Sequence, residues 1–119
     1  MTVTLYGIRN CETVKRARAA LDAAAIPFHF HDFRKDGLAS ETARSWLDTL
    51  GADTVINRRG TTWRSLSSAD RDRAESEPAS LLAEQPSLVK RPVFDRDGAL
   101  RVGFPRADEA VILDWLRDA

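Results

Sequence analysis

The sequence predicts one α/β domain with a mixed sheet, and three observations predict it. The first 33 residues follow a β-α-β order, the stretch from about 38 to 86 carries helical patterns, and "PVFDRDGALRVGF" (92–104) precedes a last helical segment with the turn chemistry of a β-hairpin. A chain of 119 residues has the size of one domain. We therefore expect residues 1–119 to form a single domain with a helical insertion over about 38–86.

The β-α-β unit follows from a change of apolar period. Val3 and Leu5 alternate with threonines before Gly7, which is typical of a short buried strand. From residue 12 on, one helical face carries Val14, Ala17, Leu21 and Ala24. Pro27 ends this helix, and "FHFHDF" (28–33) alternates again. A short crossover helix implies that the two strands are parallel.

The middle of the chain is helical with turn residues between the segments. "RKDG" (34–37) predicts a turn, and "LASETARSWLDTLG" (38–51) predicts a helix that begins at Ser40 as N-cap and ends at Gly51. Ser67 followed by Asp70 resembles an acidic capping box, and Pro78 starts a further helix.

The last quarter of the chain predicts a hairpin and a helix. Pro92 opens two short strands that Asp97-Gly98 joins, which is a strong hairpin pattern. The final helix is expected over Arg106–Asp118, with an inner face made of Val111, Ile112, Trp115 and Leu116.

Composition excludes several classes of function. Eighteen basic and eighteen acidic side chains cancel, so no global field favours nucleic acid or a membrane surface. No run of 18 apolar residues occurs, and the N-terminus lacks the pattern of a signal peptide, so we expect a cytoplasmic protein, most simply a monomer. One cysteine and two histidines, His29 and His31, predict no disulfide, no metal site and no bound cofactor.

The single cysteine, Cys11, lies where the first strand gives way to the first helix. A helix N-terminus stabilises a thiolate, and thiols there have pKa values from about 3.5 to 7.5, against about 8.5 when free. The position fits a nucleophile, but it also fits a small buried hydrophobic residue. Lys90 and Arg91 precede the hairpin, so their loop can approach the end of the first strand and deliver a cation there, unless they are merely a solvated pair.

Three motifs resemble one known family. "YGIRNCETVKRAR" (6–18), "RRGTTWRSL" (58–66) and "PSLVKRPVF" (86–94) are similar to the arsenate reductase-like (ArsC/Spx) family, above all to its small YffB-type branch, which has a thioredoxin-like fold. The resemblance implies that Cys11 is a nucleophile with Arg91 beside it and that Pro92 occupies a cis-proline position. It also implies that Arg58, Arg59 and Thr61 contact a ligand.

Two departures from the family pattern shape the expected function. Arsenate reductases of this type use three arginines, of which only Arg91 aligns here, while the other two positions fall on Asn57 and Phe104. Arsenate is therefore disfavoured as the substrate, unless Arg58 or Arg59 substitutes. Spx regulators often carry a Cys-x-x-Cys pair, whose second position is Val14 in this chain.

A lone nucleophilic thiol needs an outside thiol to resolve its covalent adduct. Glutathione is abundant and anionic, and Arg9, Arg59 and Arg91 are placed to hold its carboxylates, while the Asn10 amide is available to the thiolate or a bound anion. The sequence thus favours a glutathione-dependent monothiol reductase acting on a small oxidised or disulfide substrate. The alternatives are an arsenate reductase and an Spx-like regulator that binds RNA polymerase.

Overall fold

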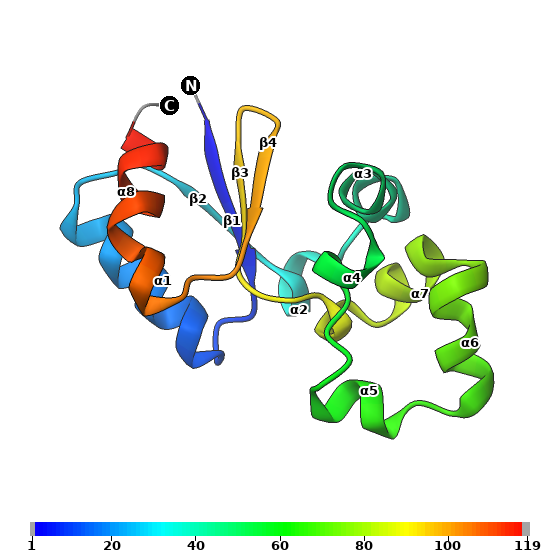
Figure 1. Cartoon of the computed structure of the whole chain (residues 1–119). Helices are drawn as coiled ribbons and strands as arrows, with labels where there is room; N and C mark the ends of the chain where they lie inside the picture. Colours follow the sequence, from blue (N-terminus) through cyan, green and yellow to red (C-terminus); the bar gives the residue numbers. More distant parts are fainter. Residues whose placement is uncertain (1, 118–119) are drawn as a thin grey trace. The chain divides into compact units, whose positions relative to one another are not determined.

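The computed structural model describes residues 2–117 and consists of two compact units (Figure 1). The first unit combines residues 1–32 with 91–119, and the second comprises 33–90. The predicted insertion lies entirely within the second unit. None of the helices in residues 2–117 has the length and apolar character needed to cross a membrane.

The first unit is built on a four-stranded mixed sheet with the order β2-β1-β3-β4. β1 (Val3–Gly7) pairs in parallel with β2 (His29–Asp32) and antiparallel with β3 (Val93–Arg96), which forms a hairpin with β4 (Ala99–Val102). Asp97 and Gly98 both have positive φ in the hairpin turn, as an Asp-Gly turn requires. The predicted parallel pair and hairpin are both confirmed.

Two helices cover one face of this sheet, α1 (Glu12–Ala23) and α8 (Glu109–Arg117) (Figure 1). Their apolar stripes meet the inward-facing residues of β1 and β3 in one core. Its buried members are Val3, Leu5, Val14, Ala17, Leu21, Ile26, Phe94, Phe104, Ile112 and Leu116.

The start and inner face of the last helix differ from the prediction. A 3₁₀ turn, η2 (Arg106–Asp108), precedes α8, and Asp118 lies outside the described residues. Val111 was predicted to face inward, but it is 59% exposed. Ile112 and Leu116, one turn apart, take the core positions, and a residue next to Ile112 is rotated by about 100° from it.

β1 and α1 approach each other closely at a glycine. A Cβ on Gly7 would lie 2.6 Å from Cγ2 and 3.0 Å from Cγ1 of Val14, which is fully buried in α1. Only a residue without a side chain lets the first turns of α1 pack this closely on the end of β1. The contact fixes the helix that follows Cys11.

The second unit is made of short helices. They are α2 (Phe33–Asp36), α3 (Ser40–Leu50), α4 (Ala52–Val55), α5 (Thr61–Ser65), α6 (Ser68–Ser76), α7 (Pro78–Glu84) and the 3₁₀ turn η1 (Pro86–Leu88). α3 packs mainly on α7. Trp46 of α3 is buried and its ring lies 6.2 Å from that of Phe33.

Three local predictions in this unit have different outcomes. The segment 34–37 is not a simple turn, because residues 33–36 form a one-turn helix and Gly37 follows with a φ of +70°. Ser40 is the first helical residue of α3 rather than its cap, since Ala39 holds the extended N-cap conformation. Ser67 does cap α6, where its Oγ accepts a hydrogen bond from the Asp70 amide at 3.1 Å.

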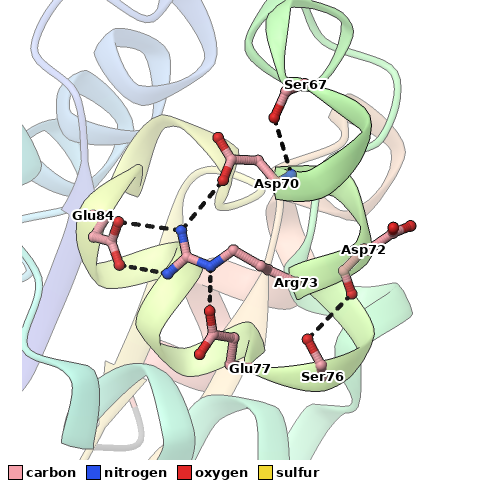
Figure 2. Close-up of polar contacts among 7 residues, drawn as sticks. All are labelled: Ser67, Asp70, Asp72, Arg73, Ser76, Glu77 and Glu84. Carbon is pink, nitrogen blue, oxygen red and sulfur yellow. Dashed lines mark hydrogen bonds and ion pairs between the residues drawn. The ribbon is translucent and has the colours of Figure 1, made fainter.

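Arg73 of α6 ties α6 to α7 through an ionic cluster (Figure 2). Its guanidinium donates hydrogen bonds to the carboxylates of Asp70 (3.4 Å), Glu84 (3.2 Å for one of two bonds) and Glu77. These hydrogen bonds lower the pKa of Glu84 and raise the pKa of Arg73. One cation thus offsets part of the repulsion among three carboxylates.

Candidate active site

The sheet topology brings the segments around Cys11 and around Arg91 to the same end of the sheet. β1 ends where the loop with Cys11 begins, and the antiparallel strand β3 starts at this same end of the sheet. Tyr6 pairs with Val93, so the next step of this register places Pro92 beside Gly7. Arg91 and Pro92 therefore precede β3 at the end of the sheet where β1 leads to Cys11.

Cys11 is the N-cap residue of α1. Its backbone is extended (φ −79°, ψ 126°), its N–H donates to the Ile8 carbonyl at 3.1 Å, and its carbonyl accepts from the Lys15 N–H at 2.9 Å. The side chain makes no capping hydrogen bond and is half-buried against the apolar core. A thiol held at the positive end of a three-turn helix is positioned to act as a nucleophile.

The peptide bond between Arg91 and Pro92 is cis. This confirms the prediction that Pro92 occupies a cis-proline position. Pro92 is buried and Arg91 is half-buried. Arg9 and Asn10 lie exposed in the loop between β1 and α1, immediately before Cys11.

The other predicted ligand contacts belong to the second unit. Arg58 and Arg59, together with Asp53, Ile56 and Lys90, line a pocket of about 440 Å³. Arg58 pairs with Asp53 at 2.8 Å, and Lys90 donates to the Asp53 carbonyl at 2.8 Å. Both arginines are exposed. The residues that line the pocket include three cations, Arg58, Arg59 and Lys90, and one carboxylate, Asp53.

Thr61 is the exposed first residue of α5 and is not among the residues that line this pocket. Asp53 was not predicted as a site residue. Its opposite charge five positions before Arg58 was the available indication.

The model of the ArsC family matches residues 6–111. The chain belongs to the ArsC family. The chain matches a solved YffB protein with a TM-score of 0.85 at 41% identity, over 94% of this chain and 99% of that one. An arsenate reductase-related protein from Brucella melitensis matches with a TM-score of 0.75 at 45% identity, over 93% of each chain. The fold is thus the predicted thioredoxin-like α/β fold of this family.

Curated relatives of this ArsC-family chain include a regulator. An uncharacterised protein of Haemophilus influenzae is 40% identical over 86% of this chain and 90% of its own length. The global transcriptional regulator Spx of Bacillus subtilis is 27% identical over 86% of this chain and 79% of its own length. The family therefore includes both reductase-like proteins and a transcriptional regulator.

Two positions distinguish this ArsC-family site from a three-arginine oxyanion site. Phe104 is buried in the core, with its ring 5.9 Å from that of Phe94. The Asn57 side chain accepts a hydrogen bond from the Arg59 amide at 3.0 Å and so shapes its own loop. Of the three positions that the family resemblance aligns with the arginines of arsenate reductases, only Arg91 carries a guanidinium.

Arg18 of α1 was missed by the sequence analysis. Its guanidinium carbon lies 4.3 Å from the centre of the Phe30 ring, and the guanidinium carbon of Arg9 lies 6.0 Å from the same ring. The spacing of seven residues from Cys11 was the available indication, because residues seven apart share a helical face.

The opposite face of the sheet carries a tyrosine with a perturbed pKa. Tyr6 lies beside His31 across the β1–β2 pairing, with ring centres 4.8 Å apart. Burial, and to a lesser extent the negative charge of Asp95, raise the pKa of Tyr6. Among residues 2–117, no group of three or more His, Cys, Asp or Glu side chains is arranged to hold a metal ion.

Proposed function

We propose that this ArsC-family protein is a monothiol reductase that uses glutathione and has Cys11 as its nucleophile. The observation that carries the proposal is the position of the only cysteine of the chain. It is the N-cap of α1, at the end of the sheet where Arg91 and Pro92 lead into β3. A reductase with one thiol needs a second thiol from solution, and glutathione is abundant in the cytoplasm, where we place the protein.

The reaction consists of two thiol–disulfide exchanges. The Cys11 thiolate attacks the glutathione sulfur of a mixed disulfide, the substrate sulfur leaves as a thiolate that takes a proton from water, and Cys11 becomes glutathionylated. A free glutathione thiolate then attacks the glutathione sulfur of this adduct, which releases glutathione disulfide and restores the Cys11 thiolate. The substrate sulfur is reduced to a thiol and one free glutathione thiol is oxidised, while the transferred glutathione stays in a disulfide throughout, so the electrons balance.

The surrounding residues supply charge and shape. Arg91 offers a guanidinium beside the reacting sulfurs, Pro92 forms the wall next to Gly7, and Arg9 and Asn10 provide donors in the loop before Cys11. In the second unit, the basic pocket of Arg58 and Arg59 fits an anionic ligand, and Thr61 follows two residues later in the chain.

The test is glutathione-dependent turnover of a glutathionylated peptide by the purified protein as a monomer. We expect Cys11→Ser to abolish turnover and intact-mass measurements of the wild type to show one glutathione on Cys11. Arg91→Ala is expected to slow adduct formation by about tenfold or more, which corresponds to the loss of one charge-assisted hydrogen bond. Arg44→Ala removes an exposed arginine of the second unit and serves as the matched control. Turnover that persists without Cys11 would refute the proposal.

A regulator is the second candidate, because relatives named Spx cover most of this chain. Such a protein would bind RNA polymerase without turning over a thiol. The second position of a Cys-x-x-Cys switch is occupied by Val14, which is fully buried against Gly7, and this favours the enzyme over a redox-switched regulator.

Arsenate reduction by the wild type with glutathione is the parallel assay, and we expect little activity because the site has one of three arginines.

A further inference from the structure

Two guanidinium groups of the first unit share one aromatic ring. Arg9 comes from the loop before Cys11, Arg18 from α1, and Phe30 from β2. Their guanidinium carbons lie 6.0 Å and 4.3 Å from the ring centre. Both positive charges thus lie against the same aromatic ring, which attracts each of them.

Arg18 retains hydrogen-bond donors that no described residue uses. Its Nε is buried and has no hydrogen-bond partner, and no carboxylate of residues 2–117 pairs with it. Arg16, two positions earlier on the same helix, is the contrast: it pairs with Glu109 at 2.7 Å and donates to the Phe104 carbonyl. Arg16 therefore has a structural role, whereas Arg18 has no carboxylate partner among the described residues.

Arg18 lies on the side of α1 that leads to Cys11. Seven residues turn a helix by about two full turns, so the two positions share a face and are separated by about 10 Å along the axis. Long helical side chains lean toward the helix N-terminus, which directs the Arg18 guanidinium back toward Cys11. Lys15 lies between them on this face, but it is paired with Glu12 at 3.4 Å.

We propose that Arg18, together with Arg9, binds a carboxylate of the thiol or disulfide that reacts at Cys11. This inference rests on the proposed function and extends it, because it names the ligand class as a sulfur compound with a carboxylate about one residue away from the sulfur. The planar guanidinium fork matches a carboxylate in bidentate geometry. Arg18 thus acts as a specificity residue, separate from the chemistry at the sulfur.

Three disulfides of different charge test the site: glutathione disulfide, which is anionic, bis(2-hydroxyethyl) disulfide, which is neutral, and cystamine, which is cationic. The rate of adduct formation on Cys11 is measured by intact mass. We expect Arg18→Gln to slow the reaction with glutathione disulfide about tenfold and to leave the neutral disulfide unchanged. Arg18→Lys keeps the charge without the fork and is expected to give an intermediate rate. Lys15→Gln removes a neighbouring charge of α1 and should leave the ratio of the rates unchanged.

An equal slowing with all three disulfides would assign Arg18 a structural role and overturn the inference, as would no slowing at all. Binding of S-methylglutathione, whose sulfur cannot exchange, tests the site independently of the reactivity of Cys11. We expect the wild type to bind it in calorimetry and Arg18→Gln to bind it about tenfold more weakly. Binding without any adduct on Cys11 would refute the proposed function alone, whereas adduct formation without binding of S-methylglutathione would refute this inference alone.

Discussion

Arg18 and Arg73 are both half-buried arginines on helices, but their surroundings are opposite. Arg73 has three carboxylate partners, which accept hydrogen bonds from all three nitrogens of its guanidinium (Figure 2). Arg18 has an aromatic ring on one side and no carboxylate among the described residues. The comparison teaches that a position on an aromatic ring does not decide the role of an arginine, because Arg16 also lies on a ring and still pairs with Glu109. The presence or absence of a carboxylate partner distinguishes Arg73 from Arg18.

One contact in each unit shows a different way of fixing the structure. In the first unit, Gly7 and Val14 are in tight contact, and burial is the main cause of the raised pKa of Tyr6. In the second unit, hydrogen bonds between charged groups dominate around Arg73, and they are the main cause of the lowered pKa of Glu84. The predictions below use this contrast between packing and ion pairing.

The largest effect is expected from Gly7→Ala in the first unit. The added methyl group would lie 2.6 Å from the Val14 side chain, which is β-branched, buried and unable to move aside. We expect a loss of about 1–3 kcal/mol in the free energy of unfolding, measured by urea denaturation, with no dependence on salt. Val14→Ala in the same chain should recover part of this loss.

Gly60→Ala provides the matched control in the second unit. There a Cβ would lie 2.9 Å from the Nδ2 atom of Asn57, at the end of a side chain that can rotate. We expect a clearly smaller loss than at Gly7. Equal losses at the two glycines would contradict the view that packing fixes the first unit more strictly.

A smaller effect is expected from Arg73→Met in the second unit, and it should depend on salt. The variant leaves Asp70, Glu77 and Glu84 without their shared cation, so the Tm falls at low ionic strength. In 1 M NaCl the screening length is about 3 Å, and the difference from the wild type should narrow. Arg71→Met is the control, because Arg71 of the same helix donates only to backbone carbonyls, those of Trp63 and Arg64.

Acid gives a second readout of the same cluster. Because the pKa of Glu84 is lowered in the folded protein, its pairing contributes stability at neutral pH that is lost as the pH falls through that pKa. The Tm difference between wild type and Arg73→Met should therefore shrink below about pH 4. A difference that is constant with both pH and salt would mean that Arg73 acts through packing.

Sequence patterns predicted the elements wherever apolar residues alternate with polar ones. They failed at Val111 because Ala110, Val111, Ile112 and Leu113 are consecutive apolar residues, and only packing on the sheet selects which of them is buried. They failed at Ser40 because capping depends on the extended backbone, which Ala39 adopts, and not on the side chain alone.

The site was predictable to the extent that it is local in sequence. Cys11 follows from the strand-to-helix change, and the cis Pro92 follows from the family resemblance. The spacing from Cys11 indicates Arg18, but its contact with Phe30 could not be found in this way, because Phe30 reaches α1 only through its pairing with Leu5. That pairing places Phe30 on the sheet face that α1 covers, which the chain order alone does not reveal.

The smallest effect is expected at high pH, where the side chain of Tyr6 ionises. It is the only tyrosine of the chain, so the absorbance of ionised tyrosine reports this side chain alone. We expect its titration in the folded protein to have a midpoint above the ordinary value of about 10 and to return to about 10 in urea. The raised pKa means that Tyr6 contributes stability below pH 10 that is lost as the pH rises through the folded value.

The same titration in two variants separates burial from charge. Asp95→Asn removes the negative charge that is the lesser cause, so the midpoint should fall only slightly and stay above 10. A return to about 10 in this variant would show that charge rather than burial controls the first unit, and the contrast with the Arg73 cluster would fail. Tyr6→Phe should abolish the absorbance change and reduce the loss of stability above pH 10, because no ionisable group then remains at position 6.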